Sequence, residues 1–150
     1  MRFGPVPLAE ARGGIVAHAV RADGLVLKKG ALAAAGIETV VVAMAEPGDM
    51  GEDAAAAAIA AAVAGEALRV DTAFTGRANL FAAEAGVLVV DRDGIDQLNR
   101  IDEAITLATL PAFAAVEAGE MVATVKIIPY AVAADRVEAA AAGPLVRVAP

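Results

Sequence analysis

Residues 99–132 read N-R-I-D-E-A-I-T-L-A-T-L-P-A-F-A-A-V-E-A-G-E-M-V-A-T-V-K-I-I-P-Y-A-V and contain the two segments with the strongest strand character. These segments are 104–110 and 121–128, joined by a connection that Pro and Gly mark as a loop. In the second segment the odd positions, beginning with Met121, form an apolar face, and the even positions form a mixed one. Polar residues stand in or beside both strands, at positions where a buried strand is apolar: Asp102, Glu103, Thr106, Thr109, Thr124 and Lys126.

Lys126 is the most informative of these polar residues because a buried ammonium without a partner is very unfavourable. If the two strands pair antiparallel, Asp102 or Glu103 is the expected partner. Two interpretations remain open. Lys126 either forms a structural pair or extends its stem to reach water, or it contacts a ligand directly.

The sequence on either side of this stretch alternates short strands with short helices. A turn at Arg-Ala-Asp-Gly, residues 21–24, predicts a hairpin, and the alanine run after Glu52 and Asp53 predicts a helix. We expect helices at 31–35, 54–64, 80–85, 94–100 and 135–142, and Asp93 is the expected N-cap of the helix at 94–100. We expect further strands at 14–20, 25–28, 39–43, 68–70 and 87–90. This order predicts an α/β (mixed α+β) fold, with a small mixed sheet, short helices and a hairpin-rich lobe.

The chain has 150 residues, enough to bury a sizeable interior. We expect residues 1–132 to form one domain, with two small lobes sharing a core as the alternative. Residues 133–150 are expected to be a helical linker or the entry to a further domain.

Residues 71–79, D-T-A-F-T-G-R-A-N, follow a predicted strand and combine several binding groups. Thr75 offers a hydroxyl, Arg77 a guanidinium and Asn79 an amide around the flexible Gly76, and together they are suited to a carboxylate or phosphate. In the alternative interpretation Asn79 caps a helix that begins at Leu80, and Arg77 is simply solvated.

Composition excludes several classes of function. A net charge of −7, 3% aromatic residues and no Trp argue against nucleic-acid and anionic-membrane surfaces. With no Cys and a single His, the chain lacks a thiolate nucleophile and a His-rich metal site. The uncharged runs are too short to span a bilayer. We expect a cytoplasmic protein with no nucleic-acid partner, no membrane partner and no directly bound metal.

Catalytic motifs are absent from the sequence. It contains no G-x-S-x-G, P-loop, G-x-G-x-x-G or H-E-x-x-H pattern. Asp102 and Glu103 are adjacent, and neighbouring residues of a strand point to opposite faces, so they make a poor acid/base dyad. We therefore expect no catalytic residue, and a stand-alone enzyme such as a small-molecule transferase is the least expected function.

Three blocks resemble a known bacterial region: F-T-G-R-A-N-L at 74–80, D-E-A-I-T-L-A-T-L at 102–110 and M-V-A-T-V-K-I-I-P-Y-A-V at 121–132. The segments 4–11, 27–30 and 46–49 fit the same pattern. The chain resembles the N-terminal region of bacterial molybdopterin-binding proteins of molybdenum-cofactor biosynthesis. In those proteins the region precedes a Mog-type molybdopterin-binding domain, which is sometimes followed by a cofactor nucleotidyltransferase. The resemblance covers most of residues 1–132.

The resemblance implies a non-catalytic domain that positions a ligand or partner domains in this biosynthesis. The implied ligand is molybdopterin or the molybdenum cofactor, and the implied partners are a downstream Mog-type domain or other proteins of the pathway. The candidate ligand-binding residues are Thr75, Arg77, Asn79, Asp102, Thr106, Thr109 and Lys126. The alternative is a structural oligomerisation module in which exposed strand edges pair two copies of the chain.

The chain departs from the family in two places. The Gly- and Asp-bearing motif with which a Mog-type domain holds the pterin is missing from the sequence, so cofactor binding is expected to involve a further domain. Relatives also carry additional residues between the positions of Gly30 and Ala31, which predicts an abnormal junction there.

Overall fold

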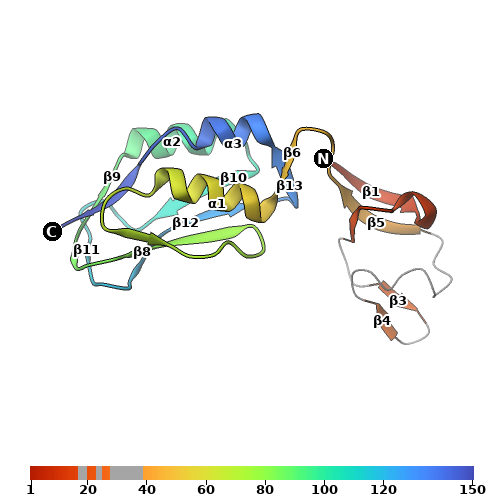
Figure 1. The fold of residues 1–150 in the computed structure, drawn as a ribbon, viewed down its shortest axis with the longest axis horizontal. Helices are drawn as coiled ribbons and strands as arrows, with labels where there is room; N and C mark the ends of the chain where they lie inside the picture. Colours follow the sequence, from red (N-terminus) through yellow and green to blue (C-terminus); the bar gives the residue numbers. More distant parts are fainter. Residues whose placement is uncertain (17–19, 23–24, 28–38) are drawn as a thin grey trace. The chain divides into compact units, whose positions relative to one another are not determined.

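The computed structural model describes residues 1–16, 20–22, 25–27 and 39–150. The chain divides into two compact units, Met1–Pro47 and Gly48–Pro150. In the described residues it forms three α-helices and several small antiparallel sheets (Figure 1). The predicted α/β fold is therefore confirmed, although its sheets are antiparallel, where the sequence predicted a mixed one.

The first unit is a small β structure. Strands β1 (Arg2–Pro7), β5 (Thr39–Met44) and β2 (Ile15–Val16) form a sheet in the order β1-β5-β2, and a 3₁₀ turn, η1 (Leu8–Glu10), follows β1. Val40 and Val42 are buried at its centre.

A hairpin of β3 (Val20–Ala22) and β4 (Leu25–Leu27) lies where the Asp-Gly turn predicted one. The predicted helix at 31–35 and the junction between positions 30 and 31 lie outside the described residues.

The second unit holds most of the secondary structure. Its elements, in chain order, are β6 (Asp49–Gly51), α1 (Glu52–Val63), β7 (Leu68–Val70), β8 (Arg77–Ala82), β9 (Gly86–Val90), α2 (Arg92–Ile101), β10 (Ile105–Thr109), β11 (Ala115–Val116), β12 (Met121–Ile127), β13 (Ala131–Ala133), α3 (Ala134–Ala140) and β14 (Val146–Ala149).

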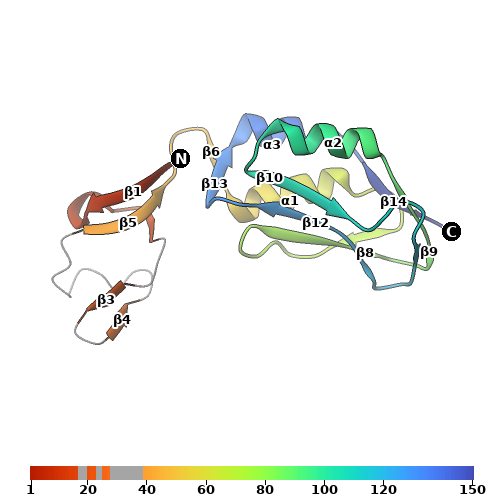
Figure 2. The ribbon, with the colours of Figure 1, turned by 180° about the vertical axis from the view of Figure 1, so that it is seen from behind.

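A four-stranded antiparallel sheet in the order β10-β12-β8-β7 organises this unit, and we call it the main sheet. Two smaller antiparallel sheets have the orders β11-β9-β14 and β13-β6. Figure 2 shows the helices together on one side of the main strands. Helix α1 packs on β8 and β12, and α2 packs on β10. The main sheet therefore has an inner face under the helices and an outer face without them.

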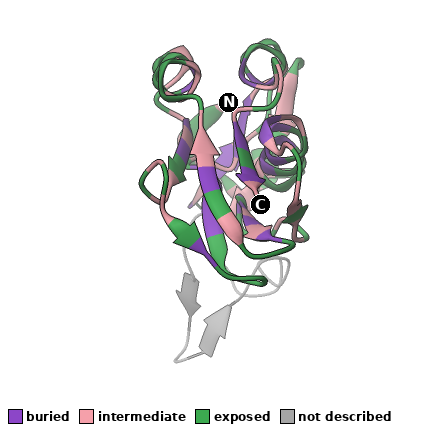
Figure 3. Ribbon diagram, turned by 90° about the vertical axis from the view of Figure 1, so that its left-hand side faces the viewer, coloured by how far each residue is buried: buried purple, intermediate pink, exposed green. Residues whose placement is uncertain are grey.

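The inner face is an aliphatic core. Leu107, Val125 and Ala78 lie opposite one another across β10, β12 and β8, and all three are buried. Ile59 and Val63 of α1 are fully buried in the same cluster. Buried and more exposed residues alternate along the strands, as expected for a sheet covered on one side (Figure 3).

The helix predicted at 80–85 is wrong, because these residues continue strand β8 and the turn after it. Ala78, Leu80 and Ala82 are buried and alternate with the more exposed Arg77 and Asn79, a period of two that only a strand produces. Pairing with β12 on one side and β7 on the other overrides the helix propensity of the alanines.

Helix α2 begins before the predicted position. Asp91, and not Asp93, is its N-cap, and the Asp91 carboxylate accepts a hydrogen bond from the Gly94 N–H at 3.0 Å. Asp93 lies in the first turn, where a negative charge is favourable against the helix dipole.

Residues 133–150, expected to be a linker, instead complete the second unit. Val137 and Ala140 of α3 and Val146 and Val148 of β14 are buried in its core, and β14 pairs with β9. The division between units falls between Pro47 and Gly48, so the expected domain over residues 1–132 does not match the boundaries of either unit.

The described part of the chain contains no helix that is both long enough and apolar enough to cross a membrane.

Candidate functional site

Strand register brings three of the predicted ligand-binding residues into one row on the outer face of the main sheet. Thr106 of β10 stands opposite Lys126 of β12, which stands opposite Arg77 of β8. Their neighbours along the strands are buried on the inner face, so these three side chains lie on the outer one. Arg77 is exposed, and Thr106 and Lys126 are half-buried.

The next row on the same face is joined by hydrogen bonds. Thr124 Oγ1 donates to Asn79 Oδ1 at 2.8 Å, and Asn79 Nδ2 donates to Asp71 Oδ2 at 3.2 Å. The other Asp71 oxygen accepts from the Asn79 backbone N–H at 2.8 Å. Asn79 is therefore held in the middle of a strand, and the interpretation of Asn79 as a helix cap is wrong.

Lys126 binds a carbonyl group and not a carboxylate. Its Nζ donates to the Thr75 backbone oxygen at 2.5 Å, and it forms no ion pair with Asp102 or Glu103. The strands do pair antiparallel, as expected, but the two acidic residues precede β10 and so fall outside its register with β12. Asp102 instead accepts a hydrogen bond from the Ala104 N–H at 2.8 Å.

The turn before β8 is a type I′ turn. Phe74 and Arg77 exchange both backbone hydrogen bonds, at 2.9 and 3.1 Å. The central residues Thr75 and Gly76 have φ values of 50° and 70°. Positive φ at both central positions defines this turn type, which suits the twist of the flanking strands.

Contacts with helix α1 and strand β12 hold this turn in place. The Gly76 N–H donates to Asp53 Oδ1 at 2.7 Å, and the Gly76 carbonyl accepts from the Ile127 N–H at 2.7 Å. A Cβ atom at position 76 would lie 2.7 Å from the Ile127 oxygen, so only glycine fits. Thr75 contributes its carbonyl to the bond with Lys126.

Two of the seven predicted residues lie apart from this row and from the neighbouring Thr75 and Asn79. Thr109 stands opposite Ala123 on the side of the sheet that faces the helices. It lines a cavity of ≈ 560 Å³ with residues near the start of α2, including Arg92 and Asp93. Asp102 is occupied at the turn before β10. The structure thus brings together Thr75, Arg77, Asn79, Thr106 and Lys126, but not Thr109 or Asp102.

A bulge changes the outer face at the start of β12. The register shifts between Met121 and Ala123, so Met121 stands opposite Phe81 and is 49% exposed, while Val122 is buried. The assignment of Met121 to the apolar face is therefore wrong, because the extra residue of a bulge reverses the alternation before it. The Arg69 guanidinium covers the Phe81 ring at 4.7 Å from its centroid.

The predicted site omitted Phe74, Phe81 and Arg69, which also belong to β8, its turn or its neighbour β7. Period-two alternation in R-A-N-L-F-A, residues 77–82, is the sequence signal that identifies this face.

The free edge of β10 is covered at its centre by a side chain. Asn99 of α2 accepts from the Leu107 N–H at 2.8 Å and donates to the Leu107 oxygen at 3.0 Å. A carboxamide that makes both bonds takes the place of a neighbouring strand at this position. This edge cannot pair with a second chain there unless Asn99 moves away.

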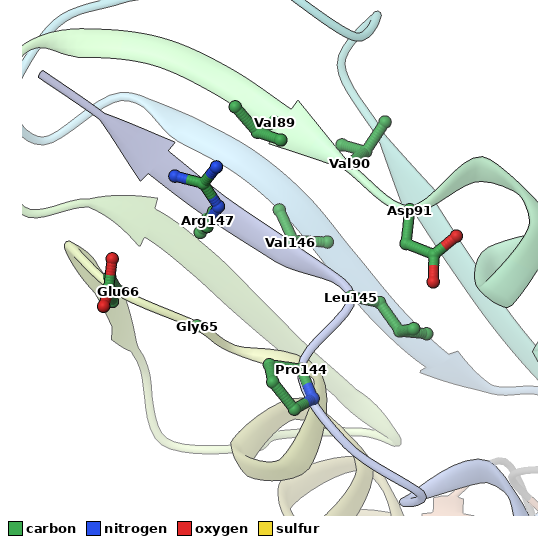
Figure 4. Close-up of a pocket in the computed structure, with 9 residues that line it drawn as sticks. All are labelled: Gly65, Glu66, Val89, Val90, Asp91, Pro144, Leu145, Val146 and Arg147. Atoms are coloured by element: carbon green, nitrogen blue, oxygen red, sulfur yellow. The ribbon is translucent and has the colours of Figure 1, made fainter.

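A separate groove of ≈ 480 Å³ lies between strands β9 and β14 and the end of α1. Figure 4 shows Glu66, Asp91 and Arg147 among its lining residues. Asp91 is occupied as the cap of α2, and the Gly65 N–H is bonded to the Val146 oxygen at 2.7 Å. The lining therefore does not bring together groups that favour one ligand class.

No protein-family model, curated protein or solved structure matches this chain. The residues that the structure describes contain no group of three or more His, Asp or Glu side chains arranged to hold a metal ion. The outer face of the main sheet is the place where the structure brings most of the predicted ligand-binding side chains together.

Proposed function

We propose that this chain is a non-catalytic binding domain that acts in molybdenum-cofactor biosynthesis, and that the outer face of its main sheet binds a phosphate-bearing ligand. The observation that carries the proposal is the cross-strand row of Thr106, Lys126 and Arg77. The resemblance of residues 74–80, 102–110 and 121–132 to molybdopterin-binding proteins supplies the identity of the ligand, molybdopterin or the molybdenum cofactor.

The row offers donors that suit a phosphate. Arg77 presents a planar set of N–H donors, and hydrogen bonds from a cation to an oxyanion are about twice as strong as neutral ones. Lys126 uses one donor on Thr75 and has two left. Two adjacent cations on one face of a chain with a net charge of −7 favour an anion at that face.

The proposed role is positioning and not catalysis. None of the three side chains is a nucleophile activated by a neighbouring base, and Asp71 is held by Asn79. The domain would present its ligand to a Mog-type domain or to another protein of the pathway, in the cytoplasm.

Calorimetry on the intact chain tests the proposal. Molybdopterin is titrated into the protein at low and at moderate salt, with inorganic phosphate as the minimal probe. We expect binding that weakens with salt and is lost in Arg77→Gln. Arg136→Gln is the matched control, since Arg136 is an exposed arginine of α3. Absence of binding to the wild-type chain, or equal binding by Arg77→Gln, would reject the proposal.

A second candidate function is a structural oligomerisation module. Large apolar side chains are exposed on or beside the same face: Phe74 at 76%, Ile128 at 64% and Met121 at 49%. Because Asn99 covers the centre of the β10 edge, two copies would associate through this face. Light scattering over a range of concentrations separates the candidates, since a strictly monomeric chain excludes this one.

A further inference from the structure

The outer row continues past Arg77 to an aromatic residue. Phe74 and Arg77 form an antiparallel bridge, so Phe74 is the next cross-strand position after Thr106, Lys126 and Arg77. Side chains directly opposite each other in an antiparallel pair lie on the same face, with Cβ atoms about 5 Å apart. One row therefore carries a hydroxyl, an ammonium, a guanidinium and a phenyl ring.

The Phe74 ring is open, unlike the other phenylalanine of this face. Phe74 is 76% exposed, whereas Phe81 is half-buried beneath the guanidinium of Arg69. Phenylalanine is among the residue types most often buried, so an open ring beside a cation is an observation that needs an explanation. Folding of the second unit does not use this ring, because its core is aliphatic.

The backbone under the ring is fixed before any ligand arrives. Asp53 and Ile127 bind the two polar groups of Gly76, and Lys126 binds the carbonyl of Thr75. Three bonds from two other elements thus hold a two-residue turn. A rigid turn loses little conformational entropy on binding, which favours affinity at its flanking residues.

We propose that this row recognises a planar heterocycle that carries a phosphate group. The heterocycle stacks on Phe74, the phosphate pairs with Arg77 and with the remaining donors of Lys126, and Lys126 also positions the turn through Thr75. Neighbouring strands are about 4.8 Å apart, so the four positions span about 14 Å, comparable with a mononucleotide or a pterin phosphate. The phosphate contact rests on the proposed function, and the stacking ring is the addition.

Charge and size favour this ligand over the other possible occupants of the face. Two adjacent cations attract an anion, and the row itself carries a single open ring, which provides one stacking position. An acidic peptide and a second copy of the chain are the competing occupants, and the experiment separates them.

The experiment compares phosphates with and without a planar ring. The intact chain is titrated with cytidine monophosphate, a pterin phosphate, ribose 5-phosphate and inorganic phosphate, followed by calorimetry and by amide NMR shifts. We expect the better ring-bearing probe to bind about tenfold more tightly than ribose 5-phosphate, from the usual strength of aromatic stacking. Whether cytidine monophosphate or the pterin phosphate binds more tightly identifies the heterocycle.

Variants test whether the tighter binding of ring-bearing probes depends on residues of the row. Phe74→Ala should remove the preference for ring-bearing probes and leave ribose 5-phosphate binding unchanged. Phe113→Ala is the matched control, because Phe113 is also 76% exposed but lies in the connection between β10 and β11. Lys126→Met should weaken the binding of every probe and shift the Gly76 amide signal. Lys126→Arg should restore part of the binding affinity.

Each result decides between the two proposals. If the wild-type chain binds ribose 5-phosphate as tightly as both ring-bearing probes, or if Phe74→Ala binds all four like the wild type, the stacking inference is overturned while phosphate binding stands. If no probe binds, both are rejected. If Phe74→Ala changes only self-association or the binding of an acidic peptide, the face is a protein interface and the inference is overturned.

Discussion

The two faces of the main sheet belong to the same hydrogen-bonded strands but have different surroundings. On β12, Val125 is fully buried beneath α1, while the next residue, Lys126, reaches the surface and holds the turn before β8. Helices cover one face only, so the inner face supplies the apolar burial that stabilises the unit. The outer face is free to carry cations and an open aromatic ring. A shift of one residue therefore separates the side chains that stabilise the unit from those of the proposed binding row.

Substitutions at two neighbouring positions of β10 should give the largest difference in stability between the two faces. Leu107→Asp places an unpaired carboxylate in the aliphatic core, and we expect it to lower the free energy of unfolding by at least about 4 kcal/mol. Ala108→Asp, on the exposed outer face, should lower it by about 1 kcal/mol or less. Urea unfolding followed by circular dichroism measures both. Equal losses would mean that the outer face is also packed against something.

The turn at Gly76 connects the two faces, because a contact with α1 on the inner side holds the turn to which Lys126 of the outer row binds. Gly76→Ala would place a Cβ 2.7 Å from the Ile127 oxygen and 2.9 Å from Glu52 Oε2, with φ at +70°. We expect a loss of about 3 kcal/mol in the free energy of unfolding. Gly119 also has a positive φ, +85°, but has open space around it, so Gly119→Ala tests the cost of the backbone conformation alone. We expect this variant to lose about 1 kcal/mol in the free energy of unfolding. A Gly76→Ala variant as stable as Gly119→Ala would contradict the close contacts.

Asn99 belongs to a helix of the inner face but closes the edge shared by both faces. Asn99→Ala removes two hydrogen bonds to Leu107, and we expect a loss of about 1–2 kcal/mol, with hydrogen exchange accelerated at the Leu107 amide. Gln97→Ala, an exposed substitution on the same helix, is the control and should change neither quantity. Unchanged exchange at Leu107 in Asn99→Ala would show that this amide is protected by another group.

The smallest effect is expected from a polar contact on the outer face. Thr124→Val removes the hydroxyl that donates to Asn79, and we expect a loss of about 0.5–1 kcal/mol because the site is partly exposed. Thr106→Val, on the same face, should be close to neutral for stability. Thermal unfolding of the two variants side by side makes the comparison. A loss as large as that of Leu107→Asp would remove the distinction between the faces.

Much of the fold could be predicted from local patterns. The alanine run predicted α1, and the β-branched segments predicted β5, β9, β10 and β12, because these patterns match the periods of a helix or a strand over several residues. The segment from Leu80 failed because alanine favours a helix in isolation, whereas here two partner strands select the extended form. The cap of α2 was misplaced by two residues because both Asp91 and Asp93 are good capping residues, and only the backbone geometry distinguishes them.

The sequence predicted which residues contribute to the candidate site more successfully than how they are arranged. Thr106, Lys126 and Arg77 were selected one by one, and cross-strand register placed them in a row. Thr109 was selected for the same reason as Thr106, but the odd spacing between them puts Thr109 on the other face. Phe74 was not selected, because a ring in a loop carries no local signal of its exposure.

The sequence by itself determined the α/β class, the aliphatic character of the core and the scarcity of cations, since these follow from composition and periodicity along one segment. Tertiary structure alone decided that Lys126 binds the Thr75 carbonyl, that Met121 turns outward at a bulge, and that Phe74 extends the row of Arg77. The physical reason is that these facts depend on register and on contacts between residues distant in the chain, which no local pattern encodes.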